Sequence, residues 1–228
     1  MSYVYVCPMQ ASKLISSSLV TLHPDDDGDK ALSLMDELRV NHLAVVRNSF
    51  YLGILSEKEI LSWDKTDEFI DEHLAELTAP SVIGSQHLFD IIQTVELNSL
   101  SIIPVLNEEK HYLGAITNRK LLYTIAKSTA VQSIGGVIVL QMNQNDYSMS
   151  EIARIIESND TKILSSYITS TPEARKIELT LKLNKTDITA IIRDFERFDY
   201  TITASFKQDD KNDDFLDRYE SLMRFLNP

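Results

Sequence analysis

The sequence predicts a mixed α+β protein in which a duplicated unit is followed by a second, different unit. The segment Tyr51–Leu61 returns as Tyr112–Leu122, with the Tyr, Leu and Gly that open it and the Leu that closes it unchanged. A period of this length indicates one supersecondary unit built twice. Beyond position 133 the pattern of apolar residues changes and no longer follows the repeat. A chain of 228 residues is long enough for two ordinary domains.

The first copy is expected over residues 11–63, within a domain at 1–63. The acidic run 25–29 follows His23-Pro24 and predicts a turn and a helix start, because carboxylates favour the positive end of a helix. Apolar residues at helical spacing follow. Two short runs around the turn Asn48-Ser49 predict paired strands, and Ser56 predicts a helix cap. The residues of these elements are Ser16–Leu22 (approach loop and short strand), Ala31, Leu34, Met35 and Leu38 (helix), Leu43–Val46 and Tyr51–Leu55 (strands), and Ile60 and Leu61 (second helix).

The second copy is expected over residues 74–126, within a domain at 64–130. A connecting helix is predicted over Asp67–Leu77, and Thr117 predicts the cap of the last helix. The turn at 107–111 is longer than its counterpart, so the offset between the two copies grows by one position across it. The other elements expected are a strand at Val82-Ile83, a helix over 88–97, and strands at Ile102–Leu106 and Tyr112–Ile116.

Residues 134–208 predict a β-α-β-β-α-β unit, the split arrangement of ferredoxin-like folds. Ser148 begins a Ser-x-x-Glu capping box, and Thr186-Asp187 is expected to open a second helix. Residues 209–228 predict an acidic linker and an amphipathic helix. The strands are expected at Val137–Met142, Lys162–Ser170, Lys176–Leu183 and Thr201–Phe206, with Thr171–Ala174 as a turn.

Composition and motifs exclude several classes of function. The net charge of −12 argues against a nucleic-acid-binding protein. Cys7 is the one cysteine, so no intramolecular disulfide can form, and no signal peptide or membrane span is visible. We expect a cytoplasmic protein that does not contact membranes. No phosphate-binding glycine loop and no nucleophile motif occurs, which predicts that the chain is not an enzyme.

The duplicated unit resembles the CBS domain, which normally occurs as a tandem pair. The residues that carry the resemblance are Leu43–Val46 against Ile103–Leu106, and Gly53–Ser56 against Gly114–Thr117. The C-terminal unit resembles an ACT domain through its order of elements. A tandem CBS pair followed by an ACT-like unit is similar in architecture to the AcuB-type acetoin-utilisation proteins.

The resemblance implies a regulatory protein with an adenine-nucleotide pocket beside each buried strand. AMP, ADP, ATP and S-adenosylmethionine are the candidate ligands, and none is a required cofactor. Ser56 and Thr117 match the hydroxyl that contacts ribose or phosphate. The position of the ribose-binding Asp holds Glu59 in the first copy and Lys120 in the second, so both depart from the family pattern. Thr21, Ala44 and Pro104 complete the implied site residues.

Lys120 has donors and no acceptor, so it cannot hold a ribose diol as a carboxylate does. This difference favours the first pocket. The alternative is that Ser56 and Thr117 are only helix caps, that both pockets are vestigial, and that the chain is a structural assembly protein.

The spacing of the histidines and acidic residues argues against a metal site. The run from His23 to Asp29 fails the EF-hand pattern, because Leu34 stands where the final Glu is required. No His-x-x-x-His pair exists, which argues against zinc. The turn 143–148 lacks the glycine typical of amino-acid-binding ACT domains, which favours pairing of sheets between two chains. We therefore expect a homodimer that regulates an unidentified protein partner.

Overall fold

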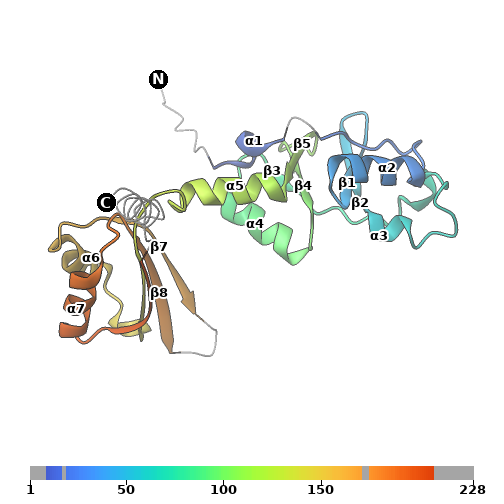
Figure 1. Cartoon of the computed structure of the whole chain (residues 1–228). Coiled ribbons are helices and arrows are strands. Elements are labelled where there is room, and N and C mark those ends of the chain that lie inside the picture. The colour runs from blue at the N-terminus through green and yellow to red at the C-terminus, as the bar shows by residue number, and fades with distance from the viewer. Residues whose placement is uncertain (1–8, 17–18, 171–174, 208–228) are drawn as a thin grey trace, which may run out of the picture. The chain divides into compact units, whose positions relative to one another are not determined.

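The computed structural model describes residues 9–16, 19–170 and 175–207 (Figure 1). The chain forms two compact units, Met1–Ile125 and Ala126–Pro228. Cys7, the predicted turn at 171–174 and the predicted closing helix within 209–228 lie outside the described residues.

The first copy of the repeat begins with a short helix and then places a hairpin between two further helices. Asp27 caps α2, because its Oδ1 accepts from the backbone N–H of Lys30 at 2.8 Å. The hairpin pairs β1 with β2 in antiparallel register, with a bulge between Val45 and Val46. The elements are α1 (Ala11–Leu14), α2 (Gly28–Leu38), β1 (His42–Arg47), β2 (Phe50–Ser56) and α3 (Glu57–Ile60).

The second copy repeats this layout, as the sequence predicts. β4 pairs with β5 in antiparallel register, with a bulge between Val105 and Leu106, the positions that correspond to Val45 and Val46 in the first copy. β3 adds a parallel strand beside β4. The elements are η1 (Ile70–His73), β3 (Val82–Ile83), α4 (Leu88–Leu97), β4 (Ile102–Leu106), β5 (Tyr112–Thr117) and α5 (Asn118–Ser128).

Both copies contribute to one hydrophobic core. Leu43 and Val45 from β1 and Ile103 and Val105 from β4 are all fully buried in it. These runs are apolar at successive positions because both faces of the small sheets are covered. Burial of the paired strands on both sides joins the two copies into a single folding unit.

The predicted helix over Asp67–Leu77 is wrong, since only a 3-10 turn at Ile70–His73 forms. The backbone of this segment is bonded elsewhere. The N–H groups of Ile70 and Asp71 donate to the carbonyls of Asp26 and Pro24 at 3.0 and 2.9 Å. Because those donors are used by the loop before α2, they cannot enter a helical ladder.

The approach strand predicted before His23 is reduced to one bridge, in which Leu22 pairs with Val45. The short helix α1 was not predicted, because a single helical turn carries too little periodicity to be detected.

The second unit has the predicted β-α-β-β-α-β order. Its antiparallel sheet runs in the order β7-β8-β6-β9, and the alternating burial of β8 directs Ile177, Leu179, Leu181 and Leu183 into the core. α6 and α7 cover one face of this sheet (Figure 1). The elements are β6 (Val137–Asn143), η2 (Gln144–Asp146), α6 (Met149–Glu157), β7 (Ile163–Ser170), β8 (Lys176–Leu183), α7 (Thr189–Arg197) and β9 (Thr201–Phe206).

The mixed α+β fold class is confirmed. The Oγ of Ser148 accepts from the N–H of Glu151 at 3.4 Å and caps α6 as predicted. α7 begins at Thr189, slightly later than predicted, and Asp187 accepts from the N–H of Thr189. Among the described residues, no helix combines the length and the apolar character that crossing a bilayer requires.

Candidate functional site

The two copies of the repeat meet along β1 and β4, and hydrogen bonds join them at both ends of these strands. At one end the N–H of Tyr112 donates to the carbonyl of Ser49 at 2.8 Å, and Phe50 packs on His111 with ring centroids 4.6 Å apart. At the other end the N–H of Asn41 donates to the Oγ of Ser101 at 3.0 Å. The boundary is therefore a defined surface, and a cleft on it has walls from both copies.

A cleft of about 680 Å³ opens at the Asn41 end of this boundary. Its size falls in the usual range of small-molecule pockets, about 300–1,000 Å³. Its lining is rich in hydroxyl and amide groups, and Lys58 and Glu57 are its charged side chains. The lining residues are Asn41, His42, Ser56, Glu57, Lys58, Leu61 and Ser62 from the first copy, and Asn98 and Ser99 from the second.

Ser56 and Glu59 form a complete capping box at the start of α3. The Oε2 of Glu59 accepts from the N–H and from the Oγ–H of Ser56, both at 2.7 Å. In return the N–H of Glu59 donates to Ser56 Oγ at 3.2 Å. The single hydroxyl proton of Ser56 is therefore already used. Ser56 keeps one lone pair with which to accept from a ligand.

The second copy places Thr117 and Lys120 in the matching positions. The N–H of Lys120 donates to Thr117 Oγ1 at 3.1 Å, so Thr117 caps α5. The ammonium of Lys120 cannot return a bond as the carboxylate of Glu59 does, because it is only a donor. The cap is preserved in both copies, and the reciprocal bond exists in one.

The remaining residues predicted for the site lie apart from the lining of the cleft. Ala44 is 1% exposed, and its carbonyl accepts from the N–H of Leu22 at 2.9 Å. Pro104 is buried in β4, and Thr21 is half-buried beside β1. Of the predicted set the structure brings Ser56 to the cleft. Glu59 and Lys120 lie one helical turn behind their capping residues.

Of the lining residues only Ser56 was predicted as a site residue, and His42 is the most informative of those that the sequence analysis missed. Its ring is half-buried, and burial lowers the pKa of the imidazole below its ordinary value of 6.5, while the carboxylate of Glu59 acts in the opposite direction. The signal available in the sequence was its position immediately before the buried strand that follows α2. That position is next to Ser56 in the register of the hairpin.

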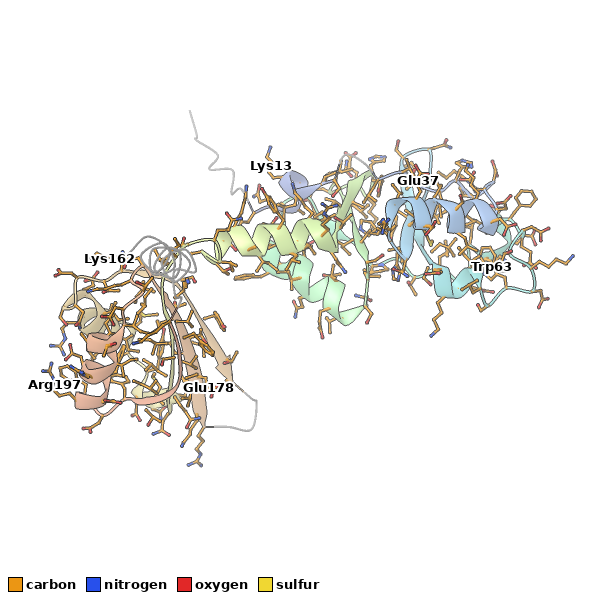
Figure 2. The ribbon with its side chains drawn as sticks, viewed as in Figure 1. Lys13, Glu37, Trp63, Lys162, Glu178 and Arg197 are labelled. Carbon is orange, nitrogen blue, oxygen red and sulfur yellow. The ribbon has the colours of Figure 1, made fainter. Side chains whose placement is uncertain are left out.

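Trp63 packs against the segment that follows the first copy. It lies beyond the end of α3 (Figure 2) and stacks on His73, with centroids 4.0 Å apart and rings nearly parallel. His73 is held in turn by Glu68 at 2.9 Å. The indole face is therefore covered on one side by protein.

A smaller hollow of about 340 Å³ lies in the second unit, where β6 leads into α6. The turn that lacks a glycine forms one wall, as η2. Asp146, Glu151 and Lys176 bring charge to the hollow, and Tyr200 lines it. Burial, followed by the charge of Glu151 and a hydrogen bond to it, raises the pKa of Tyr200. Across the described part of the chain, no group of three or more His, Cys, Asp and Glu is arranged to hold a metal ion.

Comparison with known proteins agrees with the duplicated unit. Residues 11–65 match the family model described as the CBS domain. This match covers the first copy of the repeat and confirms its resemblance to a CBS domain.

Three solved structures illustrate the similarity. The CBS domain pair/ACT domain protein of Thermotoga maritima is 16% identical, with 52% of this chain and 98% of that chain covered at a TM-score of 0.46. The CBS domains of a transcriptional regulator from Streptococcus pneumoniae are 18% identical, covering 50% and 97% at 0.43. The CBS domain of a bacterial CNNM/CorC family Mg²⁺ transporter, in complex with ATP, is 14% identical, covering 50% and 85% at 0.41.

Proposed function

We propose that this chain is a non-catalytic regulatory protein that binds an adenine nucleotide or a related metabolite in the cleft between its two repeats. The observation that carries the proposal is the cleft itself, which joins residues of both copies and contains the predicted contact residue Ser56. A ligand that touches both copies can shift their arrangement if it binds one arrangement more tightly than another.

The hydrogen bonds of the cleft favour a ribose hydroxyl as the group that contacts Ser56. A phosphate oxygen is an acceptor, and the proton of the Ser56 hydroxyl already goes to Glu59. A ribose hydroxyl is a donor and can use the free lone pair of Ser56 Oγ. In this proposal Glu59 acts through Ser56, by fixing the orientation of its hydroxyl.

The charges of the cleft favour a ligand with few phosphates. Lys58 is the side chain of its lining that carries a permanent positive charge, and Glu57 lines it as well. The whole chain carries a net charge of −12. Because like charges repel, AMP or S-adenosylmethionine is expected to bind more tightly than ATP in the absence of Mg²⁺.

Thermal melting of the purified chain with AMP, ADP, ATP, S-adenosylmethionine and NAD tests this function. A ligand at about 100 times its dissociation constant adds about 2.7 kcal/mol to the stability of the folded form and raises the melting temperature. The shift should disappear in Ser56→Ala and persist in Glu76→Ala, a control at a side chain that is 75% exposed and outside the cleft.

The alternative function is that of a structural assembly protein with vestigial pockets. The capping box favours it, because Ser56 and Glu59 have structural partners in the absence of any ligand. Melting temperatures that stay unchanged with all five ligands at millimolar concentration would support this alternative and contradict nucleotide binding.

We further propose that the chain acts as a homodimer, in the architecture of the AcuB-type proteins. Large apolar side chains on α4 and α5 are open to solvent: Phe89 is 74% exposed, Leu97 71% and Leu122 69%. Exposed apolar surface of this kind marks interaction sites, and a second copy is the simplest partner. Light scattering should give a dimer for the natural chain and a monomer for Leu122→Glu, and a monomeric natural chain would overturn this part of the proposal.

A further inference from the structure

A chain of hydrogen bonds centred on His42 ties the two repeats together at the cleft. The N–H of Asn41 donates to Ser101 Oγ at 3.0 Å, and the N–H of Ser101 donates to His42 Nδ1 at 3.2 Å. Ser101 Oγ also lies 3.0 Å from His42 Nδ1. The chain therefore leaves the first copy, passes through the second and returns to the first.

This geometry fixes the protonation of the imidazole. Because His42 Nδ1 accepts from a backbone N–H, it cannot carry a proton itself, so the ring proton sits on Nε2. With no proton on Nδ1, the Ser101 hydroxyl, which accepts from Asn41, can donate its own proton to His42 Nδ1. The bond from the Ser101 N–H requires the neutral form of the ring, since an imidazolium has two donors and no acceptor.

We propose that His42 and Ser101 form a proton-sensitive latch between the two repeats, closed while His42 is neutral and opened when Nδ1 takes a proton. Protonation removes the bond from the Ser101 N–H to the ring and reverses the hydroxyl contact, so that Nδ1–H donates to Ser101 Oγ. The Ser101 N–H is then left without its partner from the first copy, which weakens the boundary at the cleft.

The surroundings of His42 set the pH range of the latch. α3 brings Glu59, which attracts the imidazolium, and Glu57 and Lys58, which line the same cleft. β2 brings Ser56 opposite His42, and the second copy brings Asn98, Ser99 and Ser101, all uncharged. Burial outweighs the attraction to Glu59 and lowers the pKa from 6.5. A lowered histidine pKa means that the contribution to stability is complete above pH 6.5 and is lost as the pH falls below it.

The two copies of the repeat could in principle form this arrangement twice, once with the histidine in each copy, but only the first copy has the histidine. When the two copies are aligned, Ile102 corresponds to His42, and Ser101 corresponds to Asn41. The mirrored arrangement would therefore need Ile102 to accept a hydrogen bond, which its side chain cannot do. The latch is a departure from the repeat symmetry, and so it can make the cleft at this end respond to pH alone.

Nuclear magnetic resonance of the ligand-free full chain tests the latch directly. The ring of His42 is titrated from neutral to mildly acidic pH, and hydrogen exchange of the Ser101 and Asn41 amides is followed in parallel and corrected for intrinsic pH dependence. Each bond lost should lower amide protection about five-fold, the factor for a net hydrogen bond of about 1 kcal/mol. The loss should follow the titration of the His42 ring.

Two variants and one control make the test specific. His42→Asn keeps an oxygen acceptor near the position of Nδ1 and does not titrate, so Ser101 should stay protected at low pH. Ser101→Ala removes the hydroxyl and keeps the backbone N–H at this position, so the amide of residue 101 should still lose protection as His42 titrates. His23→Asn, at a side chain that is 47% exposed, should leave the pH response of Ser101 unchanged.

Protection of Ser101 that stays constant while His42 titrates would overturn the proposal. The same loss of protection in His42→Asn as in the natural chain would also overturn it. Both measurements use the chain without ligand. They are therefore independent of whether the cleft binds a nucleotide, and an unchanged melting temperature in the ligand series would leave the latch standing.

Discussion

The two repeats of this chain share a fold and differ in chemistry at matching positions. Both place a hydroxyl residue at the end of the second hairpin strand, and both use it to cap the next helix. In the first repeat the carboxylate of Glu59 returns two bonds to Ser56. In the second repeat the matching residue is Lys120, which has no acceptor to offer. The cap is therefore a requirement of the fold, whereas the reciprocal bond is a property of one site.

The largest loss of stability is expected from substitutions at the glycines of the repeated segment, Gly53 and Gly114. An alanine Cβ at Gly53 would lie 2.7 Å from Leu77 Cβ and 2.9 Å from the carbonyl oxygen of Thr78. Since backbone must move, Gly53→Ala should destabilise the first unit by about 1–3 kcal/mol. Urea denaturation followed by circular dichroism measures this cost.

Gly114→Ala should also destabilise the folded chain, but partly for a different reason. The φ of Gly114 is +147°, a conformation that L residues rarely adopt, and the new Cβ would lie 2.4 Å from Ile15 Cγ2. The double variant Gly114→Ala, Ile15→Ala should therefore recover only the part of the loss caused by the collision. Full recovery would show that the backbone conformation carries no cost.

Substitutions at the two helix caps should give the next largest loss of stability, and the loss should differ between the repeats. Ser56→Ala removes two hydrogen bonds with Glu59, whereas Thr117→Ala removes one with Lys120. Loss of a cap costs about 0.5–2 kcal/mol. Ser56→Ala is therefore expected to lower the midpoint of urea denaturation more than Thr117→Ala. Equal losses would mean that the reciprocal bond of the first repeat adds nothing to stability.

A substitution at Lys120 tests what separates the two pockets. Lys120→Asp gives the second repeat a carboxylate in place of an ammonium. If the acceptor limits binding there, calorimetry with the ligand found in the melting series should change from one site to two. A stoichiometry that stays at one would place the difference in the shape of the second pocket, and Lys127→Asp, on the same helix, controls for the change of charge.

The smallest effect at neutral pH is expected from the paired tyrosines of the repeat. Burial raises the pKa of Tyr112 to about 12, and burial together with the neighbouring Tyr112 raises that of Tyr51 still further. A raised pKa keeps both rings neutral in the folded chain, so stability is unchanged below pH 10 and is lost as the pH rises above it. Absorbance of tyrosinate at alkaline pH should show delayed ionisation that Tyr112→Phe reduces. Ionisation near the ordinary pKa for every tyrosine would contradict this expectation.

Tyr51 also shows how the repeats diverge around a common position. Its hydroxyl donates to the carbonyl of Pro80 at 3.0 Å, a residue of the second copy just before β3. The sequence marks both tyrosines as equivalent because they share a position in the repeat. The bond to Pro80 follows from the path of the chain before β3, which the repeat pattern does not contain.

The duplication, the hairpin strands and the caps at the ends of the hairpins could be predicted from the order of residues alone. Hairpins, bulges and caps depend on residues close to one another in the chain, so their signals are local. For this reason the strand at Lys176–Leu183 and the caps at Ser56, Thr117 and Ser148 were correctly predicted. The same reasoning fails over residues 67–77, where backbone donors of the segment are taken by the loop before α2, far earlier in the chain.

The packing of the two repeats decides which of the predicted residues come together. Ala44 and Pro104 occupy the strands that the family pattern indicates, yet both are buried away from the cleft. His42 and Ser101 are distant in the chain and come together because β1 and β4 lie side by side. Contacts of this kind are set by how two sheets pack, a long-range property that single positions do not encode, and this is why the cleft and its latch emerge from the fold and not from the motifs.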